Sequence, residues 1–177
     1  AEHVVVPVAE HAVELRGGRQ HREVQFGAVP GDLGRTEHGV LEAAGVLGQG
    51  QRGHYDRFRG RLMWPIRDSS GDTIGFGARR IVDDDWIEAK YLNTPETTIY
   101  KKSHVLYGLD LARREIARAS QAVIVEGYTD VMACHVAGVP TAVATCGTAF
   151  GEDHARIIRR LLQDHDEFRG EVIFTFD

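Results

Sequence analysis

The sequence predicts an α+β segment followed by an α/β domain built on a parallel sheet, and three observations lead to this prediction. Residues 55–81 carry two apolar runs separated by turn-forming residues, which is typical of a β-hairpin. Residues 122–176 carry three short apolar runs with helical patterns between them. The charge changes near residue 120, because residues 51–120 have 13 basic and 10 acidic residues and residues 121–177 have 4 and 9. We therefore expect a basic subdomain at residues 38–120 and a second domain at residues 121–177.

Residues 1–37 show no element that can be assigned. Val4–Val8 could form a strand, but Pro7 lacks a backbone donor and weakens that prediction. Gly17–Arg35 follows neither a period of 2 nor a period of 3.6. We leave residues 1–37 unassigned and hypothesise that this stretch is frame-shifted or poorly determined, which resequencing would test.

The basic subdomain is expected to begin with a short helix from about Glu37, whose apolar positions run to Leu47, before a loop at Gly48–Gly53. The hairpin follows, with strands at Leu62–Ile66 and Thr73–Ala78 joined by the turn-rich stretch Asp68–Asp72. The remaining expected elements are a polar excursion at Val82–Leu92, a loop or turn at Asn93–Thr97 and a helix with three arginines at Leu109–Ala119.

The second domain follows the order β-α-β-α-β at short spacing. Continuous apolar runs of this kind suit strands that are buried on both faces, and this order calls for a parallel sheet with right-handed crossovers. The expected strands are Ala122–Val125, Thr141–Ala144 and Val172–Phe176, and the expected helices are Thr129–Ala137 and Glu152–Gln163. Because the chain ends at Asp177, directly after an apolar run, we expect an excerpt of a longer protein whose sheet stops at its third strand.

Composition excludes several classes of protein. Apolar residues make up 42% of the chain and charged residues 27%, which is the balance of a globular domain. No apolar stretch approaches the length of a membrane span, so we predict a cytoplasmic protein with no membrane partner. The two cysteines, Cys134 and Cys146, form no C-x-x-C pair, and we interpret both as small buried residues. The nine histidines are scattered without ligand spacing, and we interpret them as surface or packing residues.

Three carboxylates are expected at one edge of the parallel sheet. Glu126 follows the first strand, Asp177 follows the third, and Asp130 lies one helical turn beyond Glu126. Ligands collect outside the carboxyl ends of such strands, and hard oxygen donors suit Mg²⁺ or Mn²⁺. The alternative is that Glu126 and Asp130 are only a turn acid and a helix-start acid, which the helix dipole favours. The residues alone leave both interpretations open.

The basic region interleaves arginines with aromatic residues. Arg57, Arg59 and Arg61 alternate with other residues near Tyr55 and Phe58, a pattern that suits a surface binding phosphates and bases. An edge strand with solvated charges explains the same pattern equally well. Consecutive acids usually mark a surface excursion, so we interpret residues 83–85 as a solvated loop.

Two segments resemble a known family. Val123–Val131, with its strand-Glu-Gly-x-x-Asp pattern, resembles the signature of the TOPRIM fold of bacterial DNA primases, and residues 144–149 and 174–177 fit its next two segments. TOPRIM modules also occur in topoisomerases and some nucleases. Lys90–Thr97, continuing to Gly108, resembles the subdomain that precedes the TOPRIM fold in primases and is absent from topoisomerases. The resemblance therefore implies a primase-type basic subdomain and a partial TOPRIM domain.

The resemblance also implies roles for individual residues. Glu126 would be the catalytic acid, Asp177 a metal ligand, and Asp130 a second residue of the Mg²⁺ or Mn²⁺ site. The second Asp expected after Asp177 lies beyond the chain. A groove for nucleotide phosphates and template would be lined by Arg79, Lys90, Tyr91, Asn93 and Lys102, joined by an arginine from Arg57, Arg59 and Arg61.

The function implied by the resemblance is metal-dependent synthesis of short RNA primers on single-stranded DNA from ribonucleoside triphosphates. A separate N-terminal module would hold zinc, and a separate C-terminal module would bind the replicative helicase. This chain alone is expected to be inactive. The alternatives are a nucleic-acid-binding fragment without catalysis, and a TOPRIM protein of the topoisomerase or recombination type.

Overall fold

The computed structural model describes residues 6–7, 26–27, 35–82, 85, 87–162 and 170–175. The chain divides into two compact units, residues 1–63 with 78–92 and residues 64–77 with 93–177. The predicted domain boundary near residue 120 stays a prediction. Residues 1–37 lie mostly outside the described residues, apart from the start of a helix and two short parallel strands, β1 (Val6–Pro7) and β2 (Phe26–Gly27).

In the described part of the first unit, one helix and an antiparallel hairpin accompany β1 and β2. Helix α1 spans Arg35–Ala43, and strands β3 (Leu47–Gly50) and β4 (Gly53–Asp56) pair with Leu47 opposite Asp56. The prediction of a helix whose apolar positions run to Leu47 was wrong at its end. Gly45 has a φ of 70°, which stops a right-handed helix, and the next two residues are buried, the second of them as the first residue of β3.

A three-stranded sheet follows in the order β5-β6-β7, made by Arg61–Arg67, Thr73–Arg80 and Tyr91–Asn93. The predicted hairpin is confirmed. Its turn is held by Asp68, whose Oδ1 accepts the backbone N–H groups of Ser70 and Asp72 at 2.8 and 3.0 Å. Asn93, predicted at the start of a turn, instead ends β7, since the N–H of the next residue, Thr94, donates to the carbonyl of Phe76 at 2.8 Å.

The second unit contains the predicted α/β domain. Its sheet has the order β11-β9-β10-β8, and β9 pairs in parallel with β10 on one side and β11 on the other. The sequence did not predict the short antiparallel edge strand β8 or the turn of 3₁₀ helix η1 that precedes it. The elements are η1 (Lys102–His104), β8 (Leu106–Tyr107), α2 (Leu109–Ala119), β9 (Gln121–Val125), α3 (Tyr128–Val136), β10 (Ala142–Thr145), α4 (Glu152–Leu161) and β11 (Glu171–Thr175).

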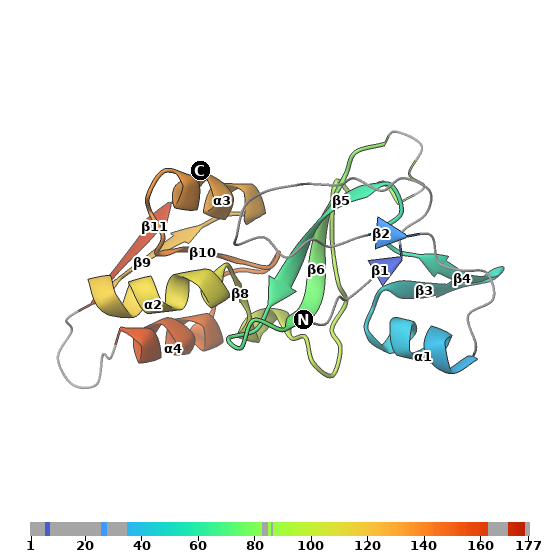
Figure 1. Ribbon diagram of the computed structural model, residues 1–177, viewed down its shortest axis with the longest axis horizontal. Coiled ribbons are helices and arrows are strands. Elements are labelled where there is room, and N and C mark those ends of the chain that lie inside the picture. The colour runs from blue at the N-terminus through green and yellow to red at the C-terminus, as the bar shows by residue number, and fades with distance from the viewer. Residues whose placement is uncertain are drawn as a thin grey trace. The chain divides into compact units, whose positions relative to one another are not determined.

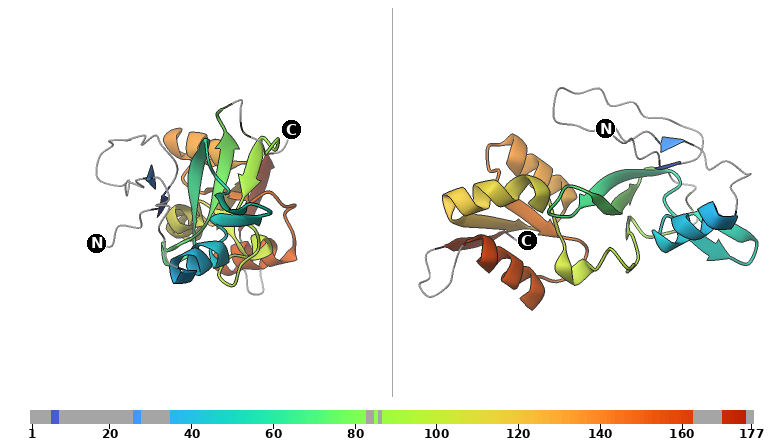
Figure 2. Two further views of the ribbon diagram at one scale, coloured as in Figure 1. Left: turned by 90° about the vertical axis from the view of Figure 1, so that its right-hand side faces the viewer. Right: turned by 60° about the horizontal axis from the view of Figure 1, so that its bottom comes forward.

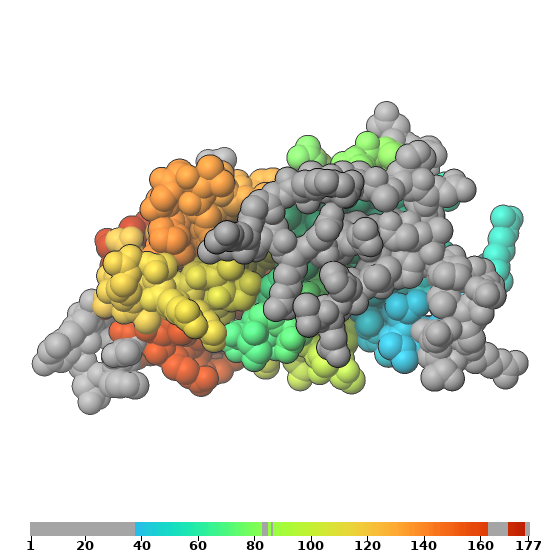
Figure 3. Space-filling model, viewed as in Figure 1, coloured from blue at the N-terminus to red at the C-terminus, as the bar shows by residue number. Residues whose placement is uncertain are grey.

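Helices cover both faces of this sheet, with α3 on one side and α2 and α4 on the other (Figures 1 and 2). Alternate residues of β9 point to opposite faces, so that Ile124 packs with α2 and α4 while Val123 and Val125 pack with α3. Each fully buried side chain such as Ile116 or Ile158 contributes about 1.5–3 kcal/mol. The outer sides of α2 and α3 are visible at the molecular surface (Figure 3). This packing makes β9 an inner strand of the sheet and so fixes where its carboxyl end lies.

Candidate functional site

The turn after β9 lies where three parallel strands end. Val125, the last residue of β9, is in register with Ala144 of β10 and Thr175 of β11. The residues that follow these strands therefore leave the same edge of the sheet, as expected for a ligand site in an open α/β fold. Glu126 is the residue that follows β9. Asp177, the predicted metal ligand after β11, lies outside the described residues.

Glu126 and Asp130 are both exposed and lie on either side of the start of α3. Asp130 Oδ2 accepts the backbone N–H of Gly127 at 2.9 Å, which caps the first turn of the helix. The helix-start interpretation of Asp130 is therefore correct for one of its oxygens, and the other has no partner among the described residues. Glu126 makes no hydrogen bond or ion pair within the described part of the chain.

Two exposed carboxylates at a strand end fit a hard divalent cation. Their donors are oxygens, and neither carboxylate is neutralised by a described Lys or Arg. No cluster of three or more His, Cys, Asp or Glu residues suited to a metal occurs within the residues that the structure describes. The described residues thus offer two carboxylates suited to Mg²⁺ or Mn²⁺, and a metal site with three acids would need a further acid from elsewhere in the chain.

The turn after β10 brings a buried thiol close to this edge. Cys146 is fully buried, and burial raises its pKa to about 11. A thiol of this kind is protonated at neutral pH and is a poor nucleophile. The interpretation of Cys146 as a small buried residue is confirmed, while Cys134 on α3 is only half-buried.

Lys102 is held at the start of η1 by its backbone. Its N–H donates to Glu96 Oε1 at 2.9 Å, and its carbonyl lies 2.9 Å from Nε2 of His154. The other ring nitrogen of His154 accepts the N–H of Gly151 at 3.1 Å, so Nε2 carries the proton that Lys102 accepts. His154 is 1% exposed and connects α4 to η1. The sequence allowed a packing role for His154 but showed nothing of this connection.

In the first unit, Tyr91 and two cations form an exposed group. Tyr91 is 47% exposed, and Arg79 Cζ and Lys90 Nζ each lie 5.9 Å from the centroid of its ring. Arg59 is also exposed and Arg57 is half-buried, both in the turn between β4 and β5. An aromatic face flanked by cations can stack on a base and neutralise a phosphate.

Arg61 has a different environment from the other arginines. Its guanidinium is 2.6 Å from Asp85 Oδ2, and the two side chains are 0% and 4% exposed. The same guanidinium donates to the carbonyls of Ile87 and Ala89 at 2.8 and 2.9 Å. Arg61 therefore stabilises the interior of the first unit through these contacts and is not a surface cation. The prediction of a solvated loop at residues 83–85 was wrong for Asp85, and residues 83 and 84 lie outside the described residues.

The side chain of Asn93 also makes its hydrogen bonds inside the protein, in the second unit. Its Nδ2 donates to the carbonyl of Cys146 at 2.9 Å, and its Oδ1 accepts the hydroxyl of Tyr128 at 2.8 Å. The family resemblance placed Asn93 in a nucleotide groove and implied no separate role for Tyr128. Their pairing is a tertiary contact between residues 35 positions apart, which no local pattern reveals.

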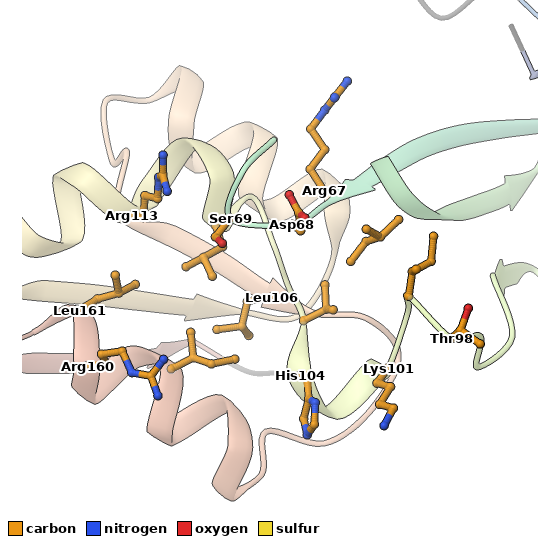
Figure 4. Close-up of a pocket in the computed structure, with 15 residues that line it drawn as sticks. Arg67, Asp68, Ser69, Thr98, Lys101, His104, Leu106, Arg113, Arg160 and Leu161 are labelled. Atoms are coloured by element: carbon orange, nitrogen blue, oxygen red, sulfur yellow. The ribbon is translucent and has the colours of Figure 1, made fainter. Parts of the chain in front are cut away.

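A cavity of about 600 Å³ lies elsewhere in the second unit (Figure 4). Its walls come from the β5–β6 turn, η1, α2 and α4, and they include Arg67, Lys101, His104, Arg113 and Arg160 around apolar residues such as Leu106. The cations do not converge, because Arg67 and Lys101 point in opposite directions. Neither Glu126 nor Asp130 lines this cavity, so it is separate from the strand-end site.

No helix among the described residues has the length and apolar character needed to cross a bilayer.

Two families match the sequence. Residues 33–113 match the N-terminal domain of the DNA primase catalytic core, and residues 120–177 match the Toprim domain. The DNA primases of Mycolicibacterium smegmatis and Streptomyces coelicolor are 67% and 66% identical to the chain over 137 residues, which is 77% of this chain and 22% and 21% of the two relatives. The chain thus spans about a fifth of the length of these curated relatives.

Solved primase structures share the fold. The RNA polymerase domain of the Mycobacterium tuberculosis primase DnaG, in complex with double-stranded DNA that has a 6-nucleotide overhang, matches with a TM-score of 0.74 and 63% identity, over 80% of this chain and 44% of that chain. A DNA primase domain from Pseudomonas aeruginosa matches with a TM-score of 0.72 and 40% identity, over 81% of this chain and 42% of that chain.

Proposed function

The chain belongs to the bacterial DNA primase family, with the N-terminal domain of the catalytic core followed by a Toprim domain, and we propose that the protein synthesises short RNA primers on single-stranded DNA. The substrates are ribonucleoside triphosphates, and the reaction is the attack of a primer 3′-hydroxyl on the α-phosphate with release of pyrophosphate. The match of residues 33–113 to a primase domain favours this function over a topoisomerase or recombination role.

The observation that supports this proposal most strongly is the exposure of Glu126 at the carboxyl end of β9, an inner strand of its sheet. Glu126 is the catalytic acid, and Glu126, Asp130 and Asp177 are the residues that would hold Mg²⁺ or Mn²⁺. The bound cation would neutralise charge on the triphosphate and stabilise the leaving pyrophosphate. Glu126, having no competing partner among the described residues, is free to ligate the cation or accept the proton of the attacking hydroxyl.

Contacts with nucleic acid, made by each unit separately, are the second part of the proposal. Arg57, Arg59, Arg79, Lys90, Tyr91 and Lys102 are the residues that would contact DNA and nucleotide phosphates. The DNA complex of the M. tuberculosis relative supports DNA as a ligand here. We leave out Arg61 and Asn93, because their polar groups already bind Asp85, Tyr128 and backbone carbonyls. The helicase and zinc modules, and action in the cytoplasm, belong to the same proposal for the whole protein.

Replacement of Glu126 tests the chemistry. Glu126→Gln, made in the natural full-length protein, should lower primer synthesis at least about 100-fold, which corresponds to the loss of one charged catalytic group. Binding of single-stranded DNA should change less than about twofold, because the variant removes no cation. Glu152→Gln is the matched control, since Glu152 is an exposed acid that begins α4. Normal primer synthesis by Glu126→Gln would exclude the assignment.

A binding module without catalysis is the second candidate, because the described residues alone hold no cluster of three metal ligands. Titration of this chain with Mn²⁺ separates the two candidates. Saturable binding that weakens in Asp130→Asn and disappears in Asp177→Asn supports the metal site, whereas no saturable Mn²⁺ binding favours the module.

A further inference from the structure

Tyr128 lies two residues after the exposed Glu126, yet its own side chain is buried and 7% exposed. It is the first residue of α3, so the backbone that carries Tyr128 also carries the turn at residues 126–127. Nothing in the chemistry proposed for the acid requires a buried phenol at this position. The contacts of this phenol therefore call for an explanation of their own.

The ring of Tyr128 is held on three sides. The Trp64 indole stacks on it, with centroids 5.2 Å apart and an interplanar angle of 8°, and the Tyr107 ring meets it edge-on at 4.7 Å and 85°. Gly77 passes so close that a Cβ there would lie 2.2 Å from Tyr128 Cζ. Trp64 is held in turn by α3, since its Nε1–H lies 3.3 Å from Sδ of Met132. The ring therefore has little freedom to move.

The hydroxyl of Tyr128 begins a chain of two hydrogen bonds. It donates to Asn93 Oδ1 at 2.8 Å, and Asn93 Nδ2 donates to the carbonyl of Cys146 at 2.9 Å. Gly147 makes room for the amide, because a Cβ there would lie 2.5 Å from Asn93 Nδ2. The chain joins the turn after β9, the end of β7 and the turn after β10.

The direction of this chain follows from its chemistry. A backbone carbonyl can only accept, so the amide nitrogen of Asn93 must face Cys146 and its oxygen must face Tyr128. The Tyr128 hydroxyl must then donate. In this arrangement every donor faces an acceptor. A flipped Asn93 amide would instead place its oxygen against the Cys146 carbonyl, so that two acceptors would face each other.

We propose that Tyr128 is a positioning residue, which through Asn93 fixes the Glu126–Gly127 turn against the Cys146–Gly147 turn at the edge where substrate binds. The proposal rests on the proposed function for the role of Glu126. It assigns Asn93 to the support of the site rather than to contact with nucleic acid. A site acid misplaced by a fraction of an ångström loses much of its effect, so a locked turn has a direct consequence for rate.

Tyr128→Phe tests this, because it keeps the ring and removes only the donor. In the natural full-length protein we expect kcat of primer synthesis to fall about tenfold to a hundredfold. KM for ribonucleotides and affinity for single-stranded DNA should stay within about twofold, since no cation is lost. Exchange of the Gly127 amide, measured by NMR or mass spectrometry, should accelerate as the turn loosens.

Asn93 variants give an independent arm if Tyr128→Phe folds poorly. Asn93→Ala should lower kcat to a similar degree without weakening DNA binding, and the double variant with Tyr128→Phe should be no slower than the slower single variant. Asn93→Asp should be the slowest of the single variants, because its carboxylate faces the Cys146 carbonyl. Tyr107→Phe is the matched control, since the Tyr107 hydroxyl donates no hydrogen bond within the described residues, and its kcat should stay at the wild-type value.

Several outcomes would overturn the proposal. One is a Tyr128→Phe variant whose kcat and Gly127 amide exchange both stay at the wild-type values. Another is an equal loss of kcat in Tyr107→Phe, which would indicate an effect of general packing. If Asn93→Ala alone weakened DNA binding, Asn93 would instead be a residue that contacts nucleic acid. Failure of the proposed function is distinguishable, because in that case Glu126→Gln itself leaves primer synthesis unchanged.

Discussion

The buried ion pair between Arg61 and Asp85 leads to the sharpest stability prediction. The charged atoms are 2.6 Å apart, and the side chains are 0% and 4% exposed. Asp85→Asn keeps the oxygen that accepts the Ile87 N–H at 2.9 Å and removes the charge that the guanidinium faces. Among the described residues the buried cation then retains only its two carbonyl partners, a loss that costs about 3–5 kcal/mol. With an m-value of about 2 kcal/mol/M, the urea midpoint should fall by roughly 1.5–2.5 M.

Arg61→Met and the double variant complete a thermodynamic cycle. Arg61→Met leaves a buried carboxylate and should cost a similar amount, while the double variant should cost clearly less than the sum of the two. Arg59→Gln is the control, since Arg59 is exposed; its stability should change by less than about 0.5 kcal/mol while its DNA affinity falls. The reasoning is refuted if Arg61→Met matches Arg59→Gln in both stability and DNA binding.

Two further predictions concern glycine and cysteine. Gly77→Ala should destabilise the chain by about 1–3 kcal/mol, because the new methyl would overlap the Tyr128 ring, whereas Gly39→Ala in α1, with nothing within 4 Å, should be neutral or stabilising in the same urea titration. Burial raises the Cys146 pKa from 9.0 to about 11, so the stability due to the neutral thiol is complete below pH 9 and is lost as the pH rises toward 11. Cys146→Ala should therefore lose less stability between pH 8.5 and about pH 10.5 than the wild type does; an identical decline in both would contradict this.

The position of Glu126 at the carboxyl end of an inner strand was predictable from local pattern. The run before Glu126 is apolar at every position, which indicates an inner strand, and the helix after it made the parallel crossover necessary. Glu126 therefore had to lie at a carboxyl end, and the structure confirms the parallel pairing on both sides of its strand. Asp177 was assigned by the same logic and stays a prediction.

The roles of Arg61, Asn93 and Tyr128 were not predictable in this way. Arg61 and Arg59 alternate in sequence and are chemically alike, yet one is buried against Asp85 and the other is exposed. Asn93 was assigned to a nucleotide groove only because the family resemblance implied it. Its real partners come from the turns after β9 and β10.

The sequence by itself determined the β-α-β-α-β order of residues 121–177, the parallel pairing of these strands and the position of Glu126 at the end of the first of them. These follow from periodicity and chain connectivity, which act over a few residues and have few topological solutions. Only the tertiary structure decided which polar side chains make their hydrogen bonds and ion pairs inside the protein. That choice depends on partners 24 to 53 residues away, as between Arg61 and Asp85 and between Asn93 and Cys146. A buried polar group must find such a partner, and the fold alone determines which one is within reach.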